Sequence, residues 1–530
     1  MAALRTCLGF VLIVAASVPS PAGSLVRFEI DASRRRPISP YIYGTNQPDW
    51  RRGPLFTLAR WGGNRTSTYN WETNASNAGA DGGHQNDGYL GMSDAPGEPV
   101  QRLAGEAFAA GASVLVTVPI LGHVARDKRA DGDVQRTPDY VLNRFYPSLP
   151  RKHRQLALQP DLYDNCVYQD EFVHWLETTF PLARRDAVRT IFYALDNKPD
   201  LWWFTHARLH PEKTRYQELL RRGVEYAAAI KQVAPQALVF GPVTCNWDGY
   251  DTLYGAPDAG GRDFLEFYLH EMQEAQQQSG GRLLDVLDLH YYPQAQGGGV
   301  RITEDDARPA VAAARVQAPR SLWDPSYVEN SWTAQNKTRG PIRLLPRMWE
   351  KINRCYHGTR LAISEYYFGG GGDISGALAE VDVLGIFGRE GVFAAALWHM
   401  GRTDDRFIRA AFAMFRNYDG HGGAFGSVGL AAATDDAERT SVYASLDWQD
   451  KLILVMLNKS PTPLLVEVSV KRARPFHFAH VYQLAGVSPE PVRLRDVLVD
   501  ASGLHCQLPS QSVTTLVLVP PKLEQTMGGR

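Results

Sequence analysis

The chain of 530 residues has little cysteine, almost no net charge and few long hydrophobic runs. Its cysteines are scattered singly, which argues against a dense disulfide framework and against a metal site built on paired cysteines. One or two disulfides would still suit an exported protein. The formal net charge of −1 argues against nucleic-acid binding, which needs a basic stripe. The aromatic residues and the 44% hydrophobic content instead fit one large or two fused globular domains.

The N-terminus has the features of a targeting segment. Arg5 precedes an apolar run over residues 7–16, and the small residues Ser20 and Ala22 suit cleavage after Ala22. We therefore expect a signal peptide over residues 1–22 and a secreted or periplasmic protein that is free of the membrane after cleavage. The alternatives are an N-terminal membrane anchor and a buried strand. The run is short for a bilayer span, and no later segment is apolar for long enough.

Between residues 46 and 425, short apolar runs alternate with amphipathic segments. In the expected helices, apolar residues recur three and four positions apart, as in residues 216–235, 262–278, 342–356 and 374–388. The expected strands are residues 55–63, 113–119, 188–197, 237–243, 283–292, 360–368 and 392–400. Apolar strands that alternate with helices are typical of parallel βα units. The pattern predicts an α/β fold, a (β/α)8 TIM-like barrel over residues 46–425, with one strand not located.

Residues 426–522 show a different pattern. Short β-type runs are separated by turns rich in Pro and Gly and by an Asn-Lys turn, without a helical stretch. This pattern predicts an additional antiparallel β-sandwich. The segment 24–45 is also strand-like, and we expect it to cross over and join the sandwich before the barrel begins.

Residues that could carry chemistry follow the predicted barrel strands, where the active sites of such barrels lie. Glu365 stands near the end of an apolar strand, before glycines 369–372, which lack the Gly-Lys-Ser/Thr ending of a phosphate loop. A carboxylate at this place suits a nucleophile; the alternative is a structural glutamate at the barrel rim. A second strand, "YALDNKPDLWW", ends in Asn197 and Lys198, ahead of Pro199 and two tryptophans.

Aromatic and polar side chains gather in the loops after the predicted strands. Pyranose rings stack their C–H faces on aromatic rings and offer hydroxyl groups to polar partners. We therefore expect a carbohydrate-binding cleft, with the core as the alternative location for any single Trp. The expected substrate contacts from these loops are Arg65, Trp71, His290, Tyr292, Trp323, Trp332 and Trp398.

The motifs "IYGTNQ", "RWGGNRTSTYNWETNASNAG", "LDNKPDLW", "DLHYYP" and "LAISEYYFGGGGDISGALAEVDVLGIFGREGVFAAALW" follow in this order from about residue 40. Together they resemble glycoside hydrolase family 44, and the resemblance extends over nearly all of the mature chain. It implies a (β/α) barrel joined to a β-sandwich, in a secreted enzyme that cleaves internal β-1,4 bonds of cellulose- or xyloglucan-type glucans. It also implies a retaining mechanism with two carboxylates.

The resemblance also assigns roles to single residues. Glu365 falls on the nucleophile, Asn197 on the asparagine that holds the sugar near the reacting centre, and Asn46 lies in a matching motif as an expected substrate contact. Lys198 stands where the family has its acid/base glutamate. A lysine is charged at neutral pH, and losing general acid catalysis typically costs about 10²- to 10⁴-fold in rate.

Lys198 leaves several explanations open. Asp196 or Asp200 could serve as the acid, the protein could bind glucan with impaired catalysis, the lysine could be a sequence variant, or it could lie on the surface outside the chemistry. We expect a monomer that binds β-glucan and no nucleic acid and that requires no cofactor. The Asp- and Asn-rich segment 77–87 is a candidate for a structural calcium ion. The sequence does not choose among cellulose, xyloglucan, mixed-linkage glucan and mannan.

Overall fold

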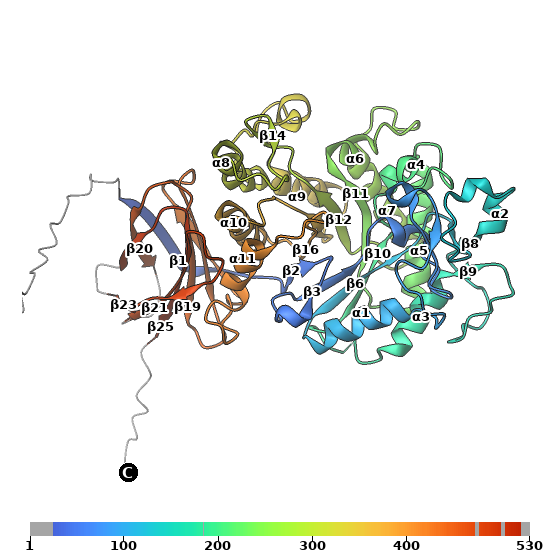
Figure 1. Cartoon of the computed structure of the whole chain (residues 1–530), viewed down its shortest axis with the longest axis horizontal. Coiled ribbons are helices and arrows are strands. Elements are labelled where there is room, and N and C mark those ends of the chain that lie inside the picture. The colour runs from blue at the N-terminus through green and yellow to red at the C-terminus, as the bar shows by residue number, and fades with distance from the viewer. Residues whose placement is uncertain (1–24, 184, 472–475, 477, 500–503, 521–530) are drawn as a thin grey trace, which may run out of the picture.

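The computed structural model describes residues 25–183, 185–471, 476, 478–499 and 504–520, and it shows two domains side by side (Figure 1). The larger domain is a closed barrel of parallel strands that follow one another around the barrel in chain order. Within the described residues its strands are β2 (Tyr41–Thr45), β3 (Leu58–Trp61), β6 (Ser113–Val118), β10 (Ile191–Leu195), β11 (Val239–Cys245), β12 (Val286–Tyr291), β15 (Arg360–Tyr366) and β16 (Ala394–Leu397). The predicted (β/α)8 barrel is confirmed.

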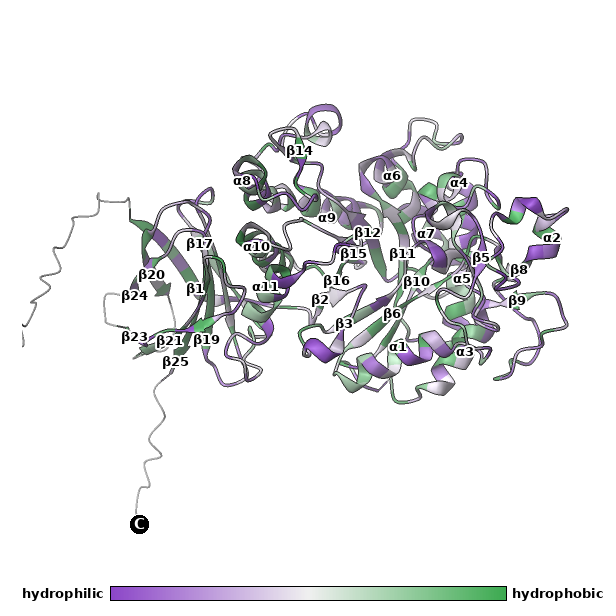
Figure 2. Cartoon of the chain, viewed as in Figure 1, coloured by the Kyte–Doolittle hydropathy of each residue, from purple (hydrophilic) through white to green (hydrophobic). Residues whose placement is uncertain are grey.

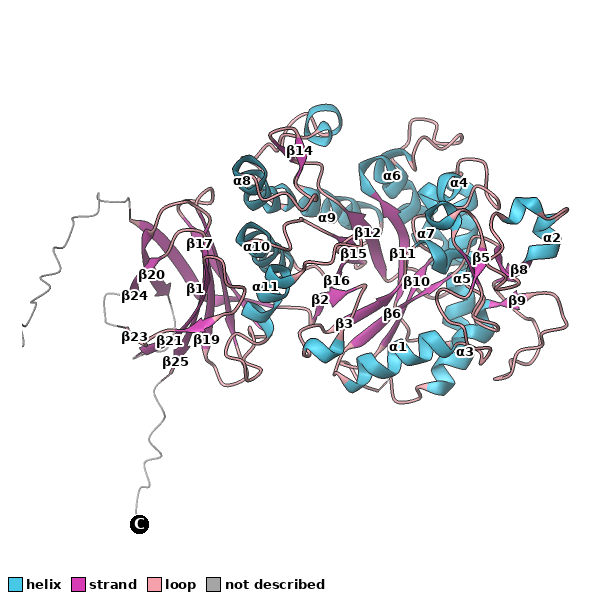
Figure 3. Cartoon of the chain, in the orientation of Figure 1, coloured by secondary structure: helices cyan, strands magenta, loops and turns pink. Residues whose placement is uncertain are grey.

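Helices cover the outside of the barrel (Figure 3). They include α1 (Glu98–Ala109), α3 (Gln169–Thr179), α5 (Tyr216–Val233), α7 (Phe264–Ser279), α8 (Pro309–Gln317), α9 (Leu344–Cys355), α10 (Ile374–Glu390) and α11 (Arg406–Arg416). The loops carry the short elements α2 (Tyr140–Arg144), α4 (Trp202–Thr205), α6 (Asn246–Thr252), β4 (Ser76–Asn77), β5 (Asn86–Asp87), β7 (His123–Ala125), β8 (Phe145–Leu149), β9 (Val167–Tyr168), β13 (Gln296–Gly297) and β14 (Val300–Arg301). Figure 2 shows hydrophobic residues concentrated on strands such as β11 and β12 and on α10, and hydrophilic ones on outer elements such as α2.

The barrel strand that the sequence did not locate is β2. It lies inside the segment 24–45, which we expected to belong entirely to the sandwich, and it pairs in parallel with β16 and β3. The segment is therefore divided: β1 (Val26–Pro37) joins the second domain, and residues 38–40 lead directly into the barrel. The predicted signal peptide lies outside the described residues.

The second domain is built from β1 together with β17 (Val428–Thr434), β18 (Thr440–Leu446), β19 (Leu452–Asn458), β20 (Leu464–Lys471), β21 (Phe478–Ala485), β22 (Val492–Arg493), β23 (Val497–Leu498), β24 (Leu504–Leu508) and β25 (Ser512–Val519). Alternate residues such as Phe28, Leu454 and Val466 form its core. The pairs of described strands are antiparallel, as predicted, except that β1 and β20 are parallel. Parallel neighbours need a long crossover connection, which the chain between β1 and β20 supplies.

Inside the barrel, β12 and β3 change from apolar to polar side chains along their length. Side chains two positions apart face the same side of a strand, and Val286 belongs to the apolar cluster that fills the start of the barrel. Asp288 and His290 follow it on the same face of β12 and are fully buried. In the same way, Arg60 follows Leu58 on β3. The strand ends therefore bring buried polar groups together at the carboxyl-terminal end of the barrel.

The two domains are joined by a tightly packed contact between α10 and the second domain. The ring of Tyr443, on β18, lies so close to Gly385 that a Cβ atom there would be 2.3 Å from the ring. The Tyr443 hydroxyl donates a hydrogen bond to Asp382 Oδ1 at 2.6 Å. Lys459 Nζ lies 3.6 Å from Asp382 Oδ2, with both side chains almost fully buried. These contacts fix the second domain against the barrel.

Two further observations concern membrane helices and cysteines. In the ranges described above, no helix is both long and apolar enough to cross a bilayer. Cys166, Cys245, Cys355 and Cys506 are all free, so the described part of the fold is held together without a disulfide.

Candidate active site

Glu365 lies near the end of β15 at the centre of the buried polar cluster, and its side chain is fully buried. A register irregularity between Leu289 and His290 on the neighbouring strand β12 brings His290 opposite Glu365. Such irregularities re-aim side chains next to active sites. The carboxylate is surrounded by polar side chains from β3, β12 and the loops after β10 and β12.

Two cations contact the Glu365 carboxylate, one on each oxygen. Arg60 Nη1 lies 2.7 Å from Oε1, and Lys198 Nζ lies 2.8 Å from Oε2. The hydroxyl of Tyr292 donates a further hydrogen bond to Oε2 at 2.8 Å. Glu365 is therefore paired with two charged side chains. A structural glutamate at the barrel rim would instead be bonded to backbone groups.

These neighbours set the ionisation of Glu365. Burial alone would raise its pKa, but His290, Lys198 and Arg60 outweigh burial and hold the pKa well below its usual range. Burial lowers the pKa of His290 to about 3, so the imidazole is neutral at neutral pH. We therefore attribute the ionised state of Glu365 mainly to the charges of Lys198 and Arg60.

Arg60 is a member of the site that sequence reasoning missed. It is fully buried and bridges the cluster, because Nη1 also donates to Asn46 Oδ1 and Nη2 donates to Asn197 Oδ1, both at 2.9 Å. A sequence signal was available: a charged residue inside an apolar strand is almost never buried without a partner. Arg65, which we expect as a substrate contact, pairs with Asp87, and its guanidinium lies 4.4 Å from the ring centre of Tyr89.

The two predicted asparagines hold Arg60 in place. The Asn46 amide donates to the carbonyl oxygens of Ser364, Ala396 and Leu397 at 3.0 to 3.2 Å. The Asn197 amide donates to Asn64 Oδ1 at 3.0 Å. Each asparagine uses its amide group for the scaffold and its oxygen for Arg60, so both orient the guanidinium against Glu365.

Lys198 reaches Glu365 from a left-handed backbone conformation, with φ of 49°. Its ammonium lies 4.7 Å from the ring centre of Trp398 and 5.8 Å from that of Tyr292. Burial lowers the pKa of a lysine, but the charge of Glu365 outweighs burial and keeps the pKa of Lys198 above its usual range. Lys198 is therefore a charged partner of Glu365 and no surface residue.

Asp196 and Asp200, the other carboxylates of this loop, are both engaged by the backbone. Asp196 accepts the N–H groups of Ile120 and Leu121 at 2.6 and 3.0 Å. Asp200 accepts the N–H of Cys245 at 3.0 to 3.2 Å, and a Cβ atom on Gly249 would lie 2.5 Å from its Oδ2. Burial raises the pKa of Asp200 to about 7. Both carboxylates are fully buried and support the loop that presents Lys198.

His290 contributes geometry rather than charge. Its Nδ1 lies 3.1 Å from Glu365 Oε2, and its Nε2 lies 3.1 Å from Ser364 Oγ. Ser364 is held in turn by its backbone N–H, which donates to Asp288 Oδ1 at 3.1 Å. The neutral ring is therefore fixed between the nucleophile position and a buried serine.

The predicted tryptophans are not all at the site. Trp398 is half-buried beside Lys198, whereas Trp71 is fully buried and stacks on Phe172 with ring centres 5.8 Å apart. Trp323 packs under Arg389, whose guanidinium is 4.1 Å from its ring centre. Trp332 lies beside Lys337. The structure thus places Trp398 beside Lys198 and places Trp71 in the core, because neighbouring aromatics in α3 bury it.

Trp398→Ala is expected to weaken oligosaccharide binding by about 0.5–1.5 kcal/mol or more, because it removes an aromatic face beside Lys198. Trp71→Ala is the matched control: it removes an equally large ring from the core and is expected to lower the free energy of unfolding by about 3–5 kcal/mol. Calorimetric titration with a cello-oligosaccharide measures the first effect. Unchanged affinity in Trp398→Ala would place the sugar elsewhere.

The segment proposed as a calcium site has other bonding partners. The amide of Asn77 donates to Asn86 Oδ1 at 2.9 Å, and Asp87 pairs with Arg65. Across the described residues, no group of three or more His, Cys, Asp or Glu side chains is arranged to hold a metal ion. The other acidic side chain of this segment, Asp81, accepts a hydrogen bond from Asn64 Nδ2 at 2.8 Å.

A parallel barrel that presents an ionised carboxylate beside aromatic rings at its carboxyl-terminal end has the architecture of a barrel glycosidase. The family model of glycoside hydrolase family 44 matches residues 73–295. Endoglucanase A of Paenibacillus lautus is 40% identical over 87% of this chain and 67% of its own length. A xyloglucanase of family 44 from Paenibacillus polymyxa, solved with xyloglucan, is 37% identical and covers 94% of this chain and 100% of its own, with a TM-score of 0.89.

A family 44 endoglucanase from Clostridium thermocellum is 36% identical, with a TM-score of 0.88 over 93% of this chain and 100% of its own. The likeness therefore extends over both domains. The chain belongs to glycoside hydrolase family 44 and is a glycoside hydrolase.

Proposed function

We propose that this protein cleaves internal β-1,4 bonds of cellulose- or xyloglucan-type glucans, with Glu365 as the nucleophile of a retaining mechanism. The observation that carries the proposal is the ionised Glu365 at the end of β15, held between Arg60 and Lys198. A retaining nucleophile must be a carboxylate when it attacks the anomeric carbon. The names of the relatives, an endoglucanase and a xyloglucanase, support a β-glucan as the substrate. The proposed reaction draws only on side chains of the chain.

The ion pair between Lys198 and Glu365 has a cost for this reaction. A retaining mechanism needs a second carboxyl group about 5–5.5 Å from the nucleophile to protonate the leaving oxygen and then activate water. Lys198 holds that place, and its raised pKa keeps it from acting as a base at neutral pH. It also neutralises part of the charge with which Glu365 would attack. We therefore infer that the protein hydrolyses polymer slowly.

An aryl β-cellobioside with an acidic leaving group is expected to lose its aglycone much faster than a soluble β-glucan is cut. The activated leaving group needs little protonation, so the absence of an acid matters less in the first step. The second step still lacks a base, and a glycosyl-enzyme on Glu365 should accumulate. Mass spectrometry of the intact protein detects this intermediate, and azide is expected to accelerate turnover because it attacks without a base. Equal rates on both substrates, without an intermediate, would contradict the assignment.

The second candidate function is glucan binding with little or no turnover. The observation that favours it is again the Lys198 ammonium, 2.8 Å from Glu365 Oε2 and over the ring of Trp398, where it satisfies the carboxylate without substrate. Retention on a glucan affinity gel, compared with the release of reducing ends, separates the two functions. Retention without reducing ends would establish the binding protein.

We further propose that the protein acts outside the cytoplasm as a monomer. The proposal rests on the basic and apolar N-terminal segment with its cleavage-compatible Ala22. N-terminal sequencing of the exported protein should begin at Gly23, and light scattering should give the mass of one chain. Retention of residues 1–22 in the mature protein would favour the membrane anchor instead.

A further inference from the structure

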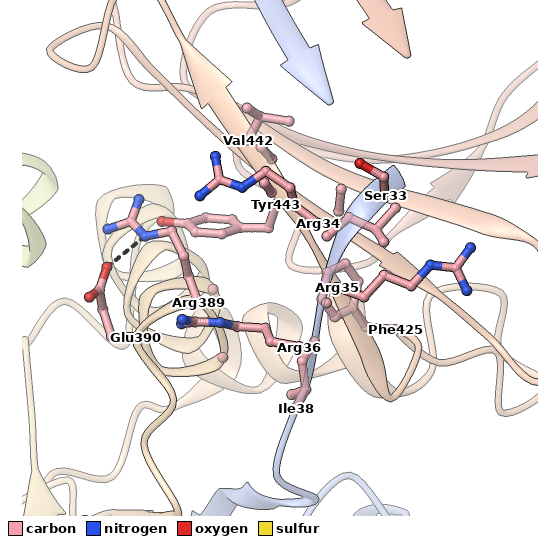
Figure 4. A pocket seen from close by; sticks show the side chains of 17 residues that line it. Ser33, Arg34, Arg35, Arg36, Ile38, Arg389, Glu390, Phe425, Val442 and Tyr443 are labelled. Carbon is pink, nitrogen blue, oxygen red and sulfur yellow. Dashed lines mark hydrogen bonds and ion pairs between the residues drawn. The ribbon is translucent and has the colours of Figure 1, made fainter. Parts of the chain in front are cut away.

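A cavity of about 660 Å³ lies where the two domains meet. Its walls come from the arginine run of β1, from β17 and β18, and from the last turn of α10 (Figure 4). The catalytic cluster is at the other end of α10, whose 17 residues correspond to about 25 Å of helix. The cavity is therefore separate from the site around Glu365.

Four arginines line this cavity, three from β1 and one from α10. Side chains alternate along a strand, so Arg34 and Arg36 extend from β1 toward α10, and Arg35 lies on the other side (Figure 4). A bulge in β1, between Asp31 and Arg35, inserts extra residues opposite β17 and re-aims this part of the strand. Arg389 completes the group from the last turn of α10.

The cationic groups of the cavity are only partly neutralised. Arg389 Nε donates to Glu390 Oε1 at 2.8 Å, while its Nη2 is buried without a hydrogen-bond partner. Among the described residues, no hydrogen bond or ion pair engages the guanidinium of Arg34 or Arg36. Arg389 also stacks on Trp323, so Arg34 and Arg36 are the free cations of the described cavity lining, against about half a negative charge from the end of α10. The balance remains clearly positive.

The floor of the cavity is small and apolar. Gly385, Gly388 and Gly429 line it together with Phe425 and Tyr443. At Gly429 an added Cβ atom would lie 3.1 Å from Ile38, so a side chain there would press on the wall. A cavity of this volume lies in the range of small-molecule sites, about 300–1,000 Å³, and exceeds what a single inorganic oxyanion needs. The ligand should carry its negative charge on a frame of one or more rings.

We propose that this interdomain cavity binds an acidic oligosaccharide, with its uronate carboxylates held by Arg34 and Arg36. The planar guanidinium matches a carboxylate with two parallel hydrogen bonds, and the exposed side chains of Arg34 and Arg36 are free to make them. The glycines of the floor leave room for the sugar rings. The site would anchor the enzyme to the acidic part of a mixed polysaccharide, while the barrel binds a neutral chain.

Trigalacturonate is the probe, and calorimetric titration of the intact protein is the measurement. The double variant Arg34→Gln/Arg36→Gln is expected to lose at least tenfold in trigalacturonate affinity, since it removes two charged donors. Its thermal midpoint, its affinity for cellotriose and its hydrolysis of polymer should stay unchanged, because both arginines are exposed and far from Glu365. Raising the ionic strength from about 0.01 M to about 0.15 M should weaken trigalacturonate binding to the unmodified protein.

Arg35→Gln is the matched control, since it removes the same charge from the other side of the same strand. It should retain trigalacturonate binding. Equal losses in Arg35→Gln and in the double variant would show a general surface-charge effect and overturn the proposal. Inorganic phosphate that binds as tightly as trigalacturonate would show a plain oxyanion site and overturn the sugar assignment. Undetectable binding of trigalacturonate at low ionic strength would overturn the proposal entirely.

Discussion

Lys198→Glu is expected to raise the hydrolysis of a soluble β-glucan by roughly 10²- to 10⁴-fold, the range that general acid/base catalysis supplies. The introduced carboxyl group would lie beside Glu365, which Arg60 still holds ionised at 2.7 Å. A like charge nearby raises the pKa of the new carboxyl, so that it can carry a proton for the leaving oxygen and lose it once Glu365 is glycosylated. Reducing-end assays on both proteins, side by side, measure the effect.

Lys198→Gln is the control for this substitution. It removes the ammonium and its ion pair with Glu365 without adding a proton donor. We expect it to leave polymer hydrolysis far below that of Lys198→Glu. An equal gain in the two variants would show that relief of the ion pair, and not acid catalysis, limits the rate. A fast unmodified protein that Lys198→Glu does not improve would mean that another group is the acid.

Glu365→Ala is expected to abolish hydrolysis and to lower the free energy of unfolding by about 3–5 kcal/mol. Removing the carboxylate leaves Arg60 and Lys198, which are almost fully buried, without their counter-charge. Denaturant unfolding of both proteins measures the stability change, and the assay on β-glucan measures the catalytic change.

A double variant tests the electrostatic explanation. Glu365→Ala/Lys198→Ala removes one of the two stranded cations, so it should regain part of the stability lost in Glu365→Ala, although two contacts are gone. If Glu365→Ala is as stable as the unmodified protein, water compensates the two cations.

The pKa of Glu365 is depressed from 4.5. The stability contributed by its charge is therefore present above pH 4.5 and is lost as the pH falls through the lower folded-state pKa.

The fold was largely predictable from the sequence because the barrel strands are buried on both sides. Residues 113–119 and 360–368 read as apolar runs and became β6 and β15. The strand β2 was not recognised as a separate strand because only three residues separate it from β1. The two strands therefore appeared as one strand-like segment. Which sheet a strand joins is decided by packing with distant residues, and the local pattern does not contain that information.

The site was predictable where motifs follow strand ends and unpredictable where tertiary packing decides. Glu365, Asn197, Lys198 and Tyr292 lie together, as expected from their positions after strands. Trp71 was expected in a loop at the cleft, but the aromatic residues of α3 cover it. Arg60 was overlooked inside a strand, although its isolation among apolar neighbours was the signal of a buried ionic partner.

The position of β1 in the second domain has a consequence for biosynthesis. Arg27 N donates a hydrogen bond to Asp435, 408 positions later in the chain, and the partner strands β17 and β20 follow the whole barrel. At a synthesis rate of about 5–20 residues per second, β1 leaves the ribosome roughly 20–80 s before these partner strands. Its apolar residues Val26, Phe28 and Ile30 stay exposed during that time, whereas the described barrel strands, β2 to β16, have all been synthesised before β17. The barrel should therefore fold first, and a stable version of it made on its own should begin at Ile38 rather than at the start of β1.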